Sequence, residues 1–124
     1  MKESEYCHAL IHRKEGDIIG ELGAIGFSTC KYWFGKTGYH PLFNVVKNEA
    51  LKTPKSEHKI INDFLDHLSK NQWNPDVFSD LCASALKTKN QDLELFNFCN
   101  DLSGKEWNIL MEYCNKTTNP IDQI

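Results

Sequence analysis

The apolar residues of this chain recur with the spacing of an α-helix, and no segment alternates apolar and polar residues for long enough to form a β-strand. The clearest example is the group Ile60, Ile61, Phe64, Leu65 and Leu68, which shares one face of a helix. The same period returns along the chain between helix-start and helix-stop residues. It predicts an all-α fold of six to seven helices packed as antiparallel hairpins, in a bundle or a short repeat-like stack.

Capping residues indicate where the helices begin and end. Gly16 ends the first expected helix, Ser56 caps the fourth and Asn74 caps the fifth. Residues 103–106, with the sequence SGKE, have the form of a capping box, so we expect one helix to end before them and another to begin there. The expected helices cover about residues 3–14, 28–34, 42–51, 57–70, 75–86, 93–102 and 104–114.

Residues 17–27 are the weakest helical candidate. Glycine destabilises a helix, and this stretch contains Gly20, Gly23 and Gly26. We therefore predict that Gly20 to Gly26 form a mobile insertion in a loop between the first two helices. Apart from a weak internal boundary near residues 53–55, the pattern predicts a single helical domain over residues 1–124.

Charge and hydropathy exclude two classes of partner. The chain has 14 basic and 17 acidic side chains and a formal net charge of −3, so no general basic field favours nucleic acid. No apolar run reaches the roughly 18 residues of a membrane helix. The N-terminus lacks a secretory signal and the five cysteines include no CxxC pair, so we expect buried free thiols and a cytoplasmic protein. His58 and His67 fall on the polar side of the fourth expected helix, as surface residues.

His8 and His12 are the clearest candidates for chemistry. They lie four positions apart on the first expected helix, so both imidazoles project from one face and could share a divalent metal ion. Glu15 lies on nearly the same face, and His40 is a candidate third ligand; these four residues are the candidate catalytic set. In the alternative interpretation, one histidine is buried with a hydrogen bond, the other packs on aromatic residues, and no cofactor is bound.

Arg13, Asp17 and Trp33 are the candidate binding residues. Arg13 is the single arginine of the chain, so any bidentate anion contact depends on it. Its nearest carboxylates in the sequence are Glu15 and Asp17, and a structural ion pair is the expected use of these charges. Trp33 is either a ligand contact or a core anchor. An antiparallel second helix would bring these residues together with His40 at the junction of the first two helices.

Several blocks of the sequence resemble an uncharacterised family of small α-helical proteins. Residues 12–17 (HRKEGD), 32–36 (YWFGK) and 38–41 (GYHP) match its patterns HRxEGD, YWFxK and GxHP, and residues 73–82 and 106–114 also fit. The resemblance covers most of the chain and implies one coherent helical domain, with no activity attached. The gap before the second block is longer than in the pattern, and the chain begins close to the first block, which leaves room for a missing N-terminal helix.

The N-terminal part also resembles one tetratricopeptide repeat. In that repeat a helix ends in Gly-Asp, a small residue starts the next helix and a proline closes the unit. Gly16-Asp17, Cys30 and Pro41 would take these places. The resemblance implies antiparallel helix pairs stacked around an apolar seam.

These features support functions of different classes. The first is a helical interaction module that binds a protein partner, with no nucleic acid and no membrane involved. The second is a small metal-dependent or acid–base enzyme centred on His8, His12, Glu15 and His40. A third, a cognate inhibitor of a toxin, rests on the analogy with other small acidic helical proteins.

Overall fold

The computed structural model describes residues 2–19 and 23–118, and the side chains of residues 3–14 and 29–116. Within this part of the chain the fold is all-α and contains no strand. Its six helices are α1 (Lys2–Ile19), α2 (Gly23–Thr37), α3 (Leu42–Leu51), α4 (Lys59–Lys70), α5 (Pro75–Lys87) and α6 (Leu93–Thr118). The predicted fold class is confirmed, with the lower of the two expected numbers of helices.

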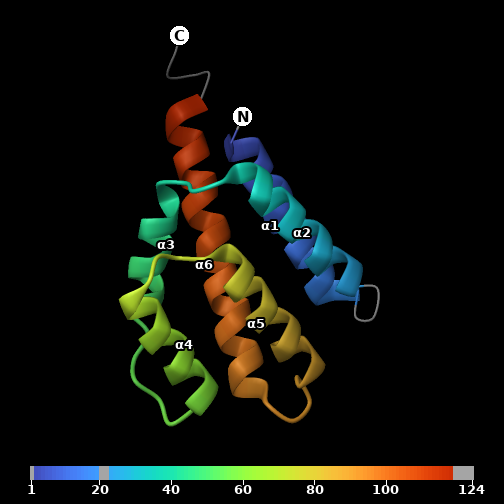
Figure 1. Cartoon of the computed structure of the whole chain (residues 1–124), viewed down its shortest axis with the longest axis vertical. Helices are drawn as coiled ribbons and strands as arrows, with labels where there is room; N and C mark the ends of the chain where they lie inside the picture. The colour runs from blue at the N-terminus through green and yellow to red at the C-terminus, as the bar shows by residue number, and fades with distance from the viewer. Residues whose placement is uncertain (1, 20–22, 119–124) are drawn as a thin grey trace.

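Successive helices run in alternating directions, as hairpin packing requires (Figure 1). α1 and α2 form a hairpin and share the most extensive helix–helix contact in the described part of the chain. α6 is the longest helix and contacts α1, α3, α4 and α5 (Figure 1). The N-terminal hairpin and the later helices therefore meet on α6.

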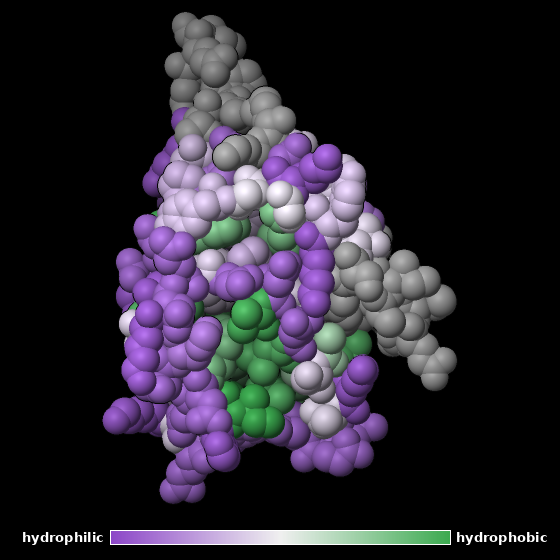
Figure 2. Space-filling view, viewed as in Figure 1, coloured by the Kyte–Doolittle hydropathy of each residue, from purple (hydrophilic) through white to green (hydrophobic). Residues whose placement is uncertain are grey.

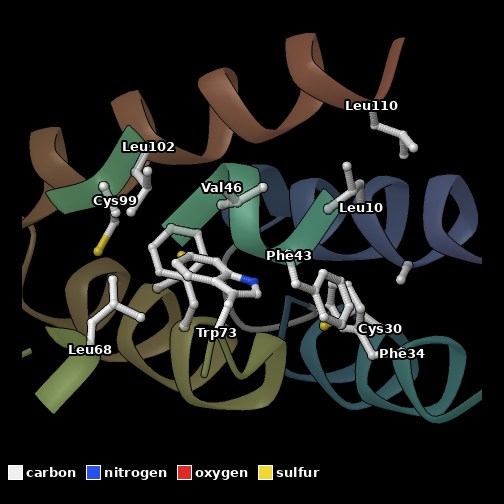
Figure 3. Close-up of a cluster of buried hydrophobic side chains, with 14 of the residues drawn as sticks. Leu10, Cys30, Phe34, Phe43, Val46, Leu68, Trp73, Cys99, Leu102 and Leu110 are labelled. Carbon is white, nitrogen blue, oxygen red and sulfur yellow. The ribbon is translucent and has the colours of Figure 1, made fainter. Parts of the chain in front are cut away.

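One hydrophobic core receives side chains from all six helices. Phe34 and Phe43 belong to it on the side of α2, and Leu68 belongs to it on the side of α4. In Figure 3 the indole of Trp73, from the turn between α4 and α5, lies between these two groups. Burial of a large apolar side chain stabilises a fold by about 1.5–3 kcal/mol, so this shared core is what holds the helices together.

The start of α5 follows the predicted capping pattern. The Asn74 side-chain oxygen accepts hydrogen bonds from the backbone N–H groups of Asp76 (3.0 Å) and Val77 (3.4 Å). Pro75 occupies the first turn, where its missing N–H costs nothing. These contacts are local in the sequence, which is why the sequence predicts them.

The start of α4 differs from the prediction, because His58 and not Ser56 is the N-cap. His58 Nδ1 accepts from the backbone N–H of Ile61, and its Nε2 lies 2.8 Å from the carboxylate of Asp92. The interpretation of His58 as a plain surface residue is therefore wrong. This half-buried ring caps α4 and connects it to the residue that precedes α6.

The predicted loop over residues 17–27 is largely helical instead. α1 continues through Gly16 to Ile19, and α2 already begins at Gly23, while residues 20–22 lie outside the described residues. Close pairing of α1 with α2 supplies the tertiary stabilisation that the intrinsic propensity of glycine lacks. The hairpin also departs from the tetratricopeptide pattern, because Cys30 lies inside α2 and not at its start.

The predicted capping box at residues 103–106 is wrong, because α6 runs through it without a break. The two helices expected on either side of the box are one helix of 26 residues. Glu106, the residue expected to cap, is fully buried and is paired with a side chain of α1. A long-range ion pair with α1 therefore forms in place of the predicted local capping contact.

Candidate functional site

A buried ion pair joins α1 to α6. Arg13 Nη2 donates a hydrogen bond to Glu106 Oε1, and both side chains are fully buried. The two residues lie 93 positions apart in the chain. Removing a charge from water costs several kcal/mol unless a partner compensates it. The pair therefore strongly restricts how α1 can lie against α6.

Two hydroxyl groups complete this contact. The Tyr6 hydroxyl donates to Glu106 Oε2 at 2.6 Å, and Arg13 Nη2 also donates to Ser103 Oγ at 3.3 Å. Burial and the adjacent Glu106 carboxylate raise the pKa of the Tyr6 phenol, which keeps it a hydrogen-bond donor. Burial alone lowers the pKa of Arg13, but the charge and hydrogen bond of Glu106, together with Cys82 and Cys30, outweigh burial and raise that pKa. We call Tyr6, Arg13, Ser103 and Glu106 the polar cluster.

Aromatic rings surround the guanidinium of Arg13. Its central carbon lies 4.8 Å from the ring centroid of Phe78 and 5.7 Å from that of Phe34. Arg13 Nε and Nη1 are buried and have no hydrogen-bond partner among the described residues. Attraction between the cation and the ring faces offsets part of this desolvation. Arg13 therefore contacts α2, α5 and α6 at once.

The ion pair expected for Arg13 is formed with Glu106, which sequence reasoning missed. The side chains of Glu15 and Asp17, the expected partners, lie outside the described residues. A usable signal was nevertheless present. Glu106 lies four positions from both Leu102 and Leu110, in the buried stripe of α6. A charge on the apolar face of a helix predicts a buried partner of opposite charge.

Beside the polar cluster, α1 and α6 border a groove of about 550 Å³. Ile11 and Trp107 line it, with 47% and 37% of their surfaces exposed. Gly104 also lines it, and a Cβ at this position would meet nothing within 4 Å. Ser103 lines the groove and also accepts from Arg13. The residues of this α1–α6 groove are Leu10, Ile11, Lys14, Asn100, Ser103, Gly104, Trp107 and Asn108.

His8 and His12 lie together, as predicted, and they stack with Trp33. The two imidazole centroids are 5.2 Å apart with an interplanar angle of 18°. His8 also stacks on the Trp33 indole at 4.2 Å and 9°. The half-buried Trp33 thus joins α2 to α1 through His8 and packs against the edge of the buried core.

His40 occupies a different environment from this stack. It is buried, and its ring contacts Tyr6 at 5.4 Å and Tyr113 at 5.8 Å. His40 Nδ1 accepts from the backbone N–H of Leu42 at 3.1 Å, so a neutral ring carries its proton on Nε2, 3.7 Å from Glu3. Through its contact with Tyr6, the His40 ring lies next to the polar cluster.

The structure thus brings together some of the predicted site residues. His8, His12 and the half-buried Trp33 form one stack, while Arg13 lies in the polar cluster. No group of three or more His, Cys, Asp or Glu side chains in the described part of the chain is arranged to hold a metal ion. The described side chains of the candidate catalytic set therefore do not form a three-ligand site.

Comparisons with known proteins add no relative. No family model, no curated protein and no solved structure matches this chain. None of the helices in the described residues is both long and apolar enough to cross a membrane.

Proposed function

We propose that this protein is a helical interaction module and that the α1–α6 groove binds an amphipathic helix of a protein partner. The observation that carries this proposal is the groove itself, in which Ile11 and Trp107 leave large apolar surfaces exposed. Apolar and aromatic side chains in a concave site are typical anchors of protein interfaces.

The chemistry of the groove favours a helix as its ligand. Its two borders are helices, so a third helix can pack its side-chain ridges between them, at about 8–10 Å from each axis. A peptide that binds as a strand needs an exposed sheet edge, and the described residues contain no strand. Among the described side chains, Lys14 is the one charged residue that lines the groove, which favours an acidic residue at the edge of the partner helix.

Figure 2 shows a second apolar surface, in the gap between α4 and α5. Separately, α5 has an exposed apolar residue, Val77. The surface in Figure 2 is a competing docking site, and the experiment below includes Val77 as an apolar position outside the α1–α6 groove. A cytoplasmic location is also part of the proposal, supported by five cysteines that are all free thiols.

The experiment uses peptides selected for binding from a displayed library of amphipathic helices. Ile11→Asp places a charge in the groove, whereas Val45→Asp makes the same change on α3 at a residue of similar exposure, 45% against 47%. We expect the Ile11 variant to bind the selected peptides about tenfold more weakly or worse, which corresponds to roughly 1.4 kcal/mol. The Val45 variant should bind them as the unchanged protein does.

A third variant, Val77→Asp, tests an exposed apolar residue of α5 outside the α1–α6 groove. Peptides that lose affinity with the Val77 variant and keep it with the Ile11 variant would contradict the groove as the binding site. Equal affinity for all variants would contradict it as well. Circular dichroism of each variant controls for loss of fold.

A further inference from the structure

A second groove, of about 440 Å³, lies between the α2–α3 link and the α4–α5 link (Figure 1). Phe34, Tyr39, Phe43 and Trp73 are the Phe, Tyr and Trp residues that line it. Tyr39 is 46% exposed, and its ring packs edge-to-face on Phe43 with the centroids 5.7 Å apart. We call this site the Trp73 groove. Its aromatic lining is already in place in the free protein.

The Trp73 indole brings an unused hydrogen-bond donor to this groove. Trp73 is buried, and its Nε1 has no hydrogen-bond partner among the described residues. Figure 3 shows the nitrogen-bearing edge of the indole on the side of Phe34 and Phe43, which both line the groove. Buried donors are almost always paired, because folding removes their hydrogen bonds to water. A ligand that carries an acceptor would therefore restore a hydrogen bond that the free protein lacks.

The charge of the lining restricts what that ligand can be. Asp76 contributes a carboxylate, and none of the described side chains that line the groove belongs to lysine or arginine. An anionic ligand would therefore meet no compensating cation, which leaves a neutral oxygen as the acceptor for the Trp73 N–H. The carboxylate favours a basic group at the edge of the ligand.

We propose that the Trp73 groove binds a proline-rich segment of a protein partner in the extended polyproline II conformation. Such segments dock on aromatic-lined grooves, and they lose little conformational entropy because their conformation is already formed. Each proline has a carbonyl acceptor and no N–H donor, so a run of prolines matches a groove that offers a donor. A lysine or arginine next to the prolines would lie near Asp76.

The test titrates the full-length ¹⁵N-labelled protein with a capped peptide of about ten prolines and one lysine, a length that forms polyproline II. The indole N–H signals of Trp33, Trp73 and Trp107 are followed by NMR. The Trp73 signal should shift downfield and saturate, whereas that of Trp107, in the α1–α6 groove, should stay in place. A glycine–serine peptide of the same length and charge should shift neither signal. A peptide with glutamate in place of lysine should bind more weakly.

Two variants test the groove from its own side. Trp73→Phe keeps an aromatic ring and removes the N–H, so the proline peptide should bind about tenfold more weakly or worse. Because Trp73 belongs to the core, Tyr39→Ser makes a second test at an exposed residue, with the same expected loss. The matched control is Tyr32→Ser, at a tyrosine of α2 that is 58% exposed and does not line the groove. It should bind the peptide as the unchanged protein does.

Several outcomes would overturn the proposal. They are equal binding of the glycine–serine peptide, a shift of Trp107 while Trp73 stays in place, or full affinity in the Tyr39→Ser variant. The proposal does not depend on a partner helix in the α1–α6 groove. Ile11→Asp should leave the affinity for the proline peptide unchanged, so failure at one groove is distinguishable from failure at the other.

Discussion

At the scale of single residues, the pair of Arg13 and Glu106 has the largest consequence, because both groups are charged and neither reaches solvent. Glu106→Ala would leave the guanidinium buried without its carboxylate and deprive the Tyr6 hydroxyl of its acceptor. We expect the free energy of unfolding to fall by about 3–5 kcal/mol, measured by urea denaturation.

The matched control for this change is Glu112→Ala. Glu112 lies on the same helix, is exposed, and pairs with Lys116 at 3.1 Å. Exposed ion pairs contribute about 0–1 kcal/mol, so this variant should remain close to the unchanged protein. Similar losses for the two variants would show that the buried pair is no more important than a surface contact.

Asp92 supplies a pH-dependent contribution to stability. Its carboxylate accepts from the backbone N–H of Leu95 at 3.1 Å and contacts the His58 ring, and these contacts lower the pKa of Asp92. A carboxyl whose pKa is lower in the folded state stabilises the fold above its unfolded value, near pH 4. That stabilisation is lost as the pH falls through the lower, folded value.

Asp92→Asn should therefore remove part of the decrease in stability on acidification, measured by urea unfolding at a series of pH values. Asp63→Asn, at an exposed carboxylate that pairs with Lys59, is the control. An acid profile of the Asp92 variant that matches the unchanged protein would contradict this assignment.

At the scale of helices, two glycines should respond to substitution in opposite directions. Gly104 lies inside α6 with open space around it, so Gly104→Ala should stabilise the protein by roughly 0.5–1 kcal/mol. Gly38, after α2, has a φ of 64°, which disfavours a side chain. Gly38→Ala should destabilise by about 1 kcal/mol or more. Thermal unfolding measures both, and a destabilised Gly104 variant would argue against a continuous α6.

The helices that the sequence predicts well are those with local signals. α5 begins at the Asn74 cap and α4 follows a regular apolar stripe, so both lie close to their expected positions. The misread segments depend on contacts with distant parts of the chain. Residues 103–106 have a capping pattern, but Glu106 pairs with Arg13 instead. Residues 23–27 are helical in a hairpin with α1, which no local propensity indicates.

The candidate site was only partly predictable for the same reason. The spacing of His8 and His12 is local, and their stacking follows from it. The contacts of Tyr6 and of Arg13 with Glu106 join opposite ends of the chain. Helical periodicity gives the face on which a residue lies, but it does not say which helix that face meets.

At the scale of the whole molecule, the shared core predicts one cooperative unfolding transition. Side chains from every described helix enter the same cluster, across the weak boundary expected near residues 53–55. Far-UV circular dichroism and tryptophan fluorescence should therefore give the same urea midpoint, because Trp33, Trp73 and Trp107 sample distant parts of the fold. Two separated transitions would indicate two independent folding units.

The long separation between Arg13 and Glu106 has a consequence for folding during synthesis. A ribosome that adds about 5–20 residues per second needs roughly 5–20 seconds to make the 93 positions between them. During this time α1 and α2 can pair with each other. The Arg13 guanidinium, however, cannot yet be buried as an ion pair, because Glu106 of α6 has not been made. The nascent N-terminal hairpin must keep Arg13 hydrated, and its final docking waits until α6 has left the ribosome.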